Sequence, residues 1–339
     1  MRAALAITLI AVSAAVLLTN THGGALAQNS ARVLFIALCV IGLGTSTIRE
    51  KALSCAALAL CAVLYISGKV DGVLAGLDLA AYFAAFIALL TALKIAAQRS
   101  NSVRVVGKYL IDQPAARRFV ATATGGHILG VFLNFGAVSL MAPLIQSATK
   151  HADGSTNTAL EQRQISALLR GFAWILLWAP TTLSQAVLLT LFTDINMGKL
   201  IPIGIGTALF MMFIGFAYDR FEWRHLSPTQ SGVERPIFHP LAFLKLGTVC
   251  FSLIAATAVL QISAGYTTAL SLMFVAPVVT LIWFGAQKDL GASLGSQLAS
   301  FWPALLDDTA GLARSAIALG LSGFIGRTLA EALPVASLV

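Results

Sequence analysis

Charged residues are scarce in this chain. Of its 339 residues only 11% are Asp, Glu, Lys or Arg, whereas 58% are hydrophobic and the mean hydropathy is +0.86. Soluble domains typically have about 25% charged residues, and a soluble chain of this size has no core large enough to bury so much apolar surface. The low charge content argues against a soluble protein and predicts one embedded in a lipid bilayer.

Motifs of the common enzyme classes are missing as well. The sequence has no glycine-rich phosphate-binding loop and no Gly-x-Ser-x-Gly elbow. Its four cysteines lie inside apolar runs without metal-ligand spacing, which is typical of small buried apolar side chains. We therefore expect no enzyme, no cofactor and no metal site. The net charge of +8 comes from basic residues in short segments between apolar runs, which indicates membrane topology and not nucleic-acid binding.

What the sequence has instead is a series of long apolar runs. Runs of about 20 residues suit membrane-spanning helices, because lipid offers no partners to backbone N–H and C=O groups. They predict an all-α, polytopic transmembrane helical bundle with about 9–10 spans, a re-entrant hairpin and a broken helix. The expected spans are 3–20, 33–48, 52–68, 73–97, 119–147, 164–192, 200–218, 241–264, 266–285 and 309–330. Asp307 and Asp308 are expected to open the last helix. The first run also has features of a signal peptide, but we favour an uncleaved first helix with a cytoplasmic N-terminus.

The distribution of basic residues predicts the hairpin. If 119–147 crosses the membrane once, the later basic segments fall on the wrong side for the positive-inside rule. If it enters and returns on one side, Lys and Arg residues in the connecting segments number fourteen inside and three outside, with Arg32 among the three. Segments 98–118, 148–163 and 219–239 would then all be cytoplasmic. A stretch of 29 residues is too short for two crossings, so we expect a re-entrant hairpin that lines a polar cavity. The alternative is one long tilted helix.

The segment 164–192 predicts the broken helix, because its centre reads Ala-Pro-Thr-Thr followed by Ser and Gln. Proline removes a helical hydrogen bond, and a helix broken inside the membrane exposes two half-helix ends that attract ions. An ordinary proline kink is the alternative. The candidate substrate-binding residues are Asn134, Gly136, Pro180, Thr181, Thr182, Ser184 and Gln185. The candidate ion-coupling residues are Thr124, Gly126 and His127, although a structural role for His127 is favoured.

Two stretches of the sequence resemble a known family. The run from Gly125 to Leu144, with Gly-Gly-His and Asn-Phe-Gly, resembles the hairpin arm of ion-transporter-superfamily permeases of the arsenite, citrate and divalent-anion symporter types. The run from Trp178 to Gln185 resembles their unwound mid-helix loop, and 108–118 resembles the interfacial helix before the hairpin. The chain has Leu-Asn-Phe where the family has a Ser-Asn-Thr type motif. The resemblance implies a first repeat over 1–199 and a second, incomplete repeat over 200–339.

Two functions remain open from the sequence. The first is a secondary active transporter, or permease, that moves a small anionic solute across the plasma membrane, expected to be a bacterial inner membrane, with Na⁺ or H⁺ as the coupling ion. The second is a non-transport scaffold or assembly subunit of a larger membrane complex. The expected partners are the lipid bilayer, the solute and a second copy in a homodimer, with no nucleic acid.

Overall fold

The computed structural model describes residues 1–21, 23–133, 135–149, 156–182, 184–185, 188, 195–224, 237–286 and 294–332. Nearly all of them are helical, so the predicted all-α class is confirmed. Seven helices among the described residues are long and apolar enough to cross a bilayer: Arg2–Thr19, Gly24–Thr45, Val70–Arg99, Gly198–Glu222, Pro240–Ala264, Thr268–Ala286 and Trp302–Ala332. The chain is therefore an integral, polytopic helical membrane protein.

The chain forms two compact units, and neither follows the predicted boundary at 199/200. Unit 1 comprises 1–95, 273–278 and 290–339, and unit 2 comprises 96–272 and 279–289. Compact units are defined by contacts, whereas repeats are segments that share a fold. The assignment of two repeats therefore stays a prediction.

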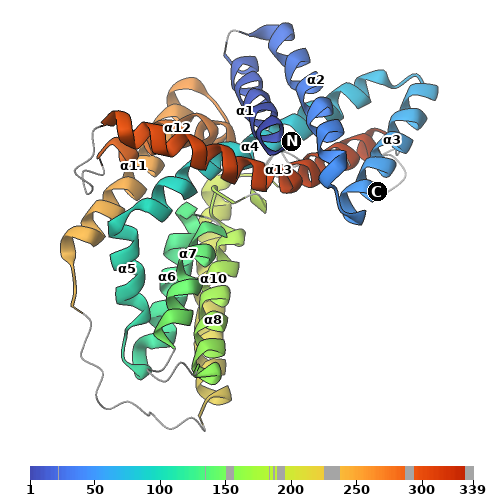
Figure 1. Ribbon diagram of the computed structural model, residues 1–339. Helices are drawn as coiled ribbons and strands as arrows, with labels where there is room; N and C mark the ends of the chain where they lie inside the picture. Colours follow the sequence, from blue (N-terminus) through green and yellow to red (C-terminus); the bar gives the residue numbers. More distant parts are fainter. Residues whose placement is uncertain are drawn as a thin grey trace. The chain divides into compact units, whose positions relative to one another are not determined.

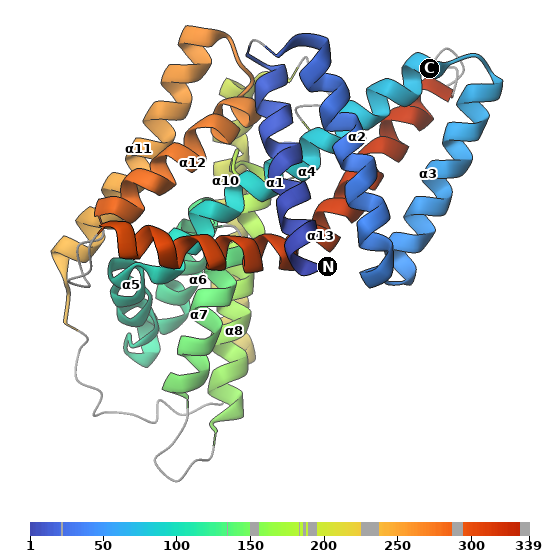
Figure 2. The same cartoon turned by 45° about the horizontal axis from the view of Figure 1, so that its top comes forward.

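Unit 1 is built from the two ends of the chain. Its helices are α1 (Arg2–Thr19), α2 (Gly24–Gly42), the 3₁₀ turn η1 (Leu43–Thr45), α3 (Ile48–Ile66), α4 (Val70–Arg99) as far as Ile95, and α13 (Leu294–Ala332). Figures 1 and 2 both show α1 and α2 side by side as a hairpin. Helices α4 and α13 are antiparallel, because Gly76 lies against Phe324 and Thr328 whereas Ala80 lies against Gly320.

Two expectations for unit 1 are wrong. Helix α2 begins at Gly24 and not at 33, so Arg32 lies inside a helix and not in an external loop. Helix α13 begins at Leu294 and runs through Pro303, since a proline removes only one hydrogen bond of a helix that packing holds together. Asp307 and Asp308 consequently lie within α13, where they face Arg2 (3.5 Å) and Lys94 (4.0 Å), and do not open a helix.

Unit 2 contains the predicted hairpin. Its helices are α5 (Asn101–Ile111), α6 (Ala115–Leu133), α7 (Phe135–Ala148), α8 (Thr158–Ala173), the 3₁₀ turn η2 (Trp174–Leu177), α10 (Met197–Glu222), α11 (Pro240–Ala264) and the parts of α12 (Thr268–Ala286) outside 273–278. In both views α6, α7 and α8 lie side by side (Figures 1 and 2). The stretch 108–118 is not a separate helix: it contains the end of α5, a turn at Pro114 and the start of α6, because Pro114 cannot continue a helix from α5.

Candidate functional site

The hairpin α6–α7 turns back on itself beside α8. Met141 of α7 lies next to Gly125 of α6, and the N–H of Asn157 donates to the carbonyl of Thr149 at 2.9 Å, which brings the end of α7 to the start of α8. The part of α6 from Phe119 to Leu133 is about 22 Å long and α7 is about 21 Å long, at 1.5 Å per residue. Both are shorter than the ~30 Å hydrocarbon core. The two arms therefore have the dimensions of a hairpin that enters the membrane without crossing it, although re-entry itself stays a prediction.

Glycines let α6 and α8 approach closely. A Cβ on Gly126 would lie 2.6 Å from the carbonyl oxygen of Leu168, and one on Gly171 would overlap the carbonyl group of Ala123. Gly130 lies against Phe172 and Ile175. Close backbone approach through small residues is the usual way in which membrane helices pack. The Gly126-x-x-x-Gly130 spacing was visible in the sequence, and it identifies Gly126 as a residue of this contact.

Helix α8 breaks after Ala173, earlier than Pro180. Residues Trp174–Leu177 tighten into a 3₁₀ turn, and Trp178 leaves helical geometry at φ −144°. The N–H of Ala179 still donates to Ile175 O at 2.9 Å, but Pro180 has no N–H with which to continue the helix. The predicted broken helix is thus present. Its continuation is described only at residues 184, 185 and 188.

Polar side chains join this break to the tip of the hairpin. Thr181 Oγ1 donates to the carbonyl oxygen of Val131 near the end of α6, and Thr181 is buried. Thr182 Oγ1 donates to Ala179 O at 2.8 Å, and Gln185 Nε2 donates to Leu176 O at 3.1 Å. These contacts place the break level with the hairpin tip. They also give carbonyl groups beside the break a side-chain donor, in addition to the Thr182 N–H that donates to Ala179 O at 3.0 Å.

His127 and Trp178 form a second link between α6 and the break. His127 Nδ1 lies 2.9 Å from Gly171 O, and Trp178 Nε1 donates to His127 Nε2 at 3.2 Å. A carbonyl can only accept and an indole N–H can only donate, so these partners select the neutral Nδ1–H tautomer. Both ring nitrogens are therefore engaged in holding α6 to the break. Protonation of Nε2 would place two donors face to face, so a coupling role for His127 requires that Trp178 moves.

The other predicted residues are placed as follows. Gly136 is buried in the first turn of α7, Pro180 and Thr124 are half-buried, and Ser184 is exposed. Asn134 lies outside the described residues. The structure thus brings Thr181, Thr182 and Gln185 together near the hairpin tip.

Some buried polar atoms of unit 2 have no partner among the described residues. Gln185 Oε1 lies beside the break, while Thr122 Oγ1 and Gln164 Oε1 lie on α6 and α8. A buried polar atom without a hydrogen bond is costly, and such atoms often mark places where water or a ligand binds. Within the described part of the chain, no three His, Cys, Asp or Glu side chains gather as a metal site would require.

The three segments predicted to share one side of the membrane meet at one end of unit 2. Arg163 forms a paired contact with Asp219, with Nε–Oδ1 at 2.9 Å and an Nη2–Oδ2 distance of 2.6 Å, and Asp219 is only 1% exposed. Tyr109 packs against Phe238 and Phe243 at ring distances of 5.6 and 5.5 Å. Residues from 98–118, 148–163 and 219–239 are thereby linked. Which side of the membrane this end faces stays a prediction.

Unit 1 contains an ion pair that was not predicted from the sequence. Arg32 Nε donates to Asp78 Oδ1 at 2.6 Å and its Nη2 donates to Oδ2 at 2.7 Å, while Gln28 Nε2 also donates to Oδ2 at 2.8 Å. Arg32 Nη1 donates to Asn29 Oδ1 at 2.9 Å. Ionisable residues inside membrane helices are expensive and usually paired. The lone Asp78 in the apolar run 73–97 was the available signal.

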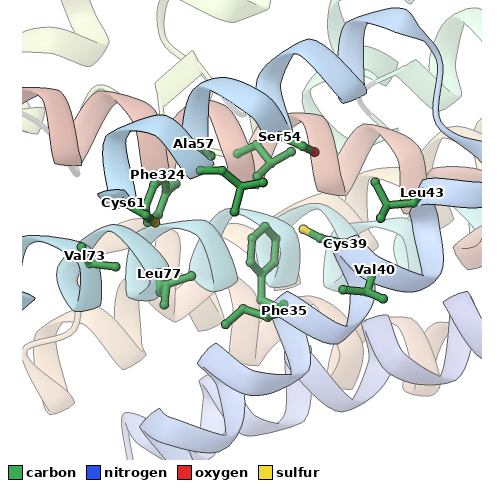
Figure 3. A pocket seen from close by; sticks show the side chains of 13 residues that line it. Phe35, Cys39, Val40, Leu43, Ser54, Ala57, Cys61, Val73, Leu77 and Phe324 are labelled. Atoms are coloured by element: carbon green, nitrogen blue, oxygen red, sulfur yellow. The ribbon is translucent and has the colours of Figure 1, made fainter. Parts of the chain in front are cut away.

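Unit 1 also contains an apolar pocket of about 340 Å³ (Figure 3). Phe35, Cys39, Leu77 and Phe324 contribute to its walls, and Ser54 supplies the one hydroxyl. Ser54 Oγ already donates to Glu50 O at 2.9 Å. These walls offer an anionic solute no partners, so the pocket is a poor candidate for the site.

Comparison of the chain with protein-family models, with curated proteins and with solved structures finds no match.

Proposed function

We propose that this protein is a secondary active transporter that moves a small anionic solute across the membrane, with Na⁺ or H⁺ as the coupling ion. The observation that carries the proposal is the bond from Thr181 Oγ1 to Val131 O, which joins a helix broken inside the bundle to the tip of a helical hairpin. Irregular backbone is tolerated at membrane depth only where protein buries it or where it lines a cavity. Transporters use such broken helices to present half-helix ends to solutes and ions.

The chemistry around the break supports an anion as the solute. The first turn of α7 begins at Phe135, and the N–H groups at a helix N-terminus favour negative charge. On the facing segment the hydroxyls of Thr181 and Thr182 already donate to carbonyl groups, and the unpartnered amide oxygen of Gln185 is an acceptor suited to the coupling cation. The resemblance to anion permeases agrees with this interpretation. The proposed location is a bacterial inner membrane, and the distribution of basic residues supports a cytoplasmic N-terminus.

Transport in proteoliposomes tests the proposal. The purified protein is reconstituted, and uptake of labelled citrate, sulfate and arsenite is measured under inward Na⁺ or H⁺ gradients. We expect uptake of at least one of these solutes that requires the gradient. We also expect Thr181→Val and Thr182→Val to reduce it by about tenfold, which corresponds to the ~1.4 kcal/mol of one lost polar contact.

Thr207→Val is the matched control, because Thr207 is exposed on α10 and its hydroxyl bonds only its own helix, to Ile203 O at 2.9 Å. Equal uptake by Thr181→Val, Thr182→Val and Thr207→Val at equal protein levels would show that the solute does not bind at the break. A protein that moves none of these solutes under either gradient would favour the scaffold alternative.

A further inference from the structure

A second pocket, of about 420 Å³, lies within unit 2 and has a different character from the apolar pocket of unit 1. It lies where α4 passes into α5, with α11 and α12 as the other walls. Ser100, Ser102 and Lys245 supply polar groups, and Val279, Ile282 and Trp283 supply apolar surface. A ligand that fits it must therefore be polar at one end and apolar at the other.

The polar end of this pocket offers hydrogen-bond donors that no described residue uses. Ser100 and Ser102 are only 3% and 8% exposed, yet neither hydroxyl has a hydrogen-bond partner among the described residues. Ser100 is the N-cap of α5 but makes no side-chain cap bond, so the first N–H groups of this 11-residue helix also lack that partner. Two unpartnered hydroxyls on largely buried serine residues, at the positive end of a helix, are suited to an anion.

Lys245 adds a full positive charge to the same pocket. It lies in the second turn of α11 and is exposed, and no described carboxylate pairs with it. Ser100 and Ser102, the N-terminus of α5 and Lys245 thus converge from two elements. A phosphate accepts hydrogen bonds on several oxygens at once and matches this donor set.

The apolar end of the pocket opens toward the hydrocarbon region. Ile282, which lines the pocket from α12, is 67% exposed, and both α11 and α12 are apolar enough to span a membrane. Trp283 lies three residues before the end of α12, where tryptophan is enriched at the membrane–water interface. The pocket therefore has its charged part near the interface and its apolar part against lipid.

From this geometry we infer that the pocket binds an anionic phospholipid, with the phosphate held by Lys245, Ser100, Ser102 and the N-terminus of α5, and an acyl chain along Val279 and Ile282. Basic pockets between membrane helices on the cytoplasmic side commonly take anionic headgroups. The predicted topology places this end of unit 2 on that side. The inference does not depend on the proposed transport function.

Native mass spectrometry of the detergent-purified protein tests the inference with lipids of identical chains. We expect one phosphatidylglycerol to be retained under conditions that strip phosphatidylcholine. Lys245→Gln should weaken phosphatidylglycerol binding about fivefold, because one basic residue at the surface contributes roughly 1 kcal/mol toward an anionic lipid. Lys245→Arg should bind as the wild type does, and Ser102→Ala should weaken binding.

Lys199→Gln is the matched control, since Lys199 is an exposed lysine on α10 outside the pocket. Unchanged binding by Lys245→Gln, or equal retention of phosphatidylcholine, would overturn the inference, because the pocket would then select no anionic headgroup. Glycerol 3-phosphate, a soluble phosphate, is added as a competitor of phosphatidylglycerol. If it displaces phosphatidylglycerol at equal concentration, the site binds a soluble phosphate and not a lipid.

Discussion

Replacing Gly171 by alanine tests the contact between α6 and α8 on which the candidate site depends. The added Cβ would overlap the carbonyl oxygen of Ala123 and lie 2.6 Å from its carbon. These are backbone atoms, so no side-chain rotation can make room. The two helices would have to separate, and the bond between His127 Nδ1 and Gly171 O, now 2.9 Å, would lengthen with them.

The expected loss can be built from two contributions. Overpacking of a tight contact costs about 1–3 kcal/mol, and a lost hydrogen bond costs roughly 1 kcal/mol more. Alanine itself favours a helix over glycine by up to about 1 kcal/mol. With that offset subtracted, Gly171→Ala should lower the free energy of unfolding by about 1–3 kcal/mol.

The control is Gly247→Ala on α11, where a Cβ would meet nothing within 4 Å. This substitution should leave the stability unchanged or raise it slightly. The measurement is the unfolding free energy of each variant in mixed micelles, followed by circular dichroism during titration with a denaturing detergent. If Gly171→Ala and Gly247→Ala unfold at the same detergent fraction, the close packing of α6 on α8 is not as described.

Three further predictions concern other parts of the chain. In a double-mutant cycle, Arg32→Ala and Asp78→Ala should each lower the unfolding free energy by about 2–3 kcal/mol, which is less than for a fully buried pair because Asp78 is partly exposed. The double variant should lose less than the sum of the two single losses. Strictly additive losses would show that the two side chains are uncoupled. The Thr47 hydroxyl, and then the Thr47 N–H at 2.6 Å, donate to Glu50 and hold the pKa of its carboxyl below the ordinary value of 4.5. The stability that ionised Glu50 gives the folded protein through these hydrogen bonds is then present above about pH 4.5. It is lost as the pH falls through the lowered pKa of Glu50. Stability measured across this range should fall in the wild type and less in Glu50→Gln, and parallel profiles would contradict the prediction. A cysteine at exposed Thr158, in a background free of native cysteines, should resist membrane-impermeant maleimide added outside intact cells, and labelling there would refute the cytoplasmic assignment of 148–163.

Composition, charge distribution and proline placement were sufficient to predict the membrane class, the hairpin and the broken helix. These properties depend on the solvent around a segment and on local backbone chemistry. A bilayer requires long apolar helices whatever their neighbours, and Pro180 lacks an N–H in any fold. For the same reason the sequence indicated Thr181 and Thr182, which lie beside that proline.

Only the tertiary structure decided which groups meet. The register between α2 and α4 could not be predicted from either segment alone, so Arg32 was assigned to a loop, although Asp78 stabilises its charge within a helix. His127 could not be distinguished from a proton site until Trp178 and Gly171 were found at its two nitrogens. The starts of α2 and α13 depend likewise on partners distant in sequence. Contacts between segments far apart in the chain follow from the packing of whole helices, and no local pattern of residues encodes that packing.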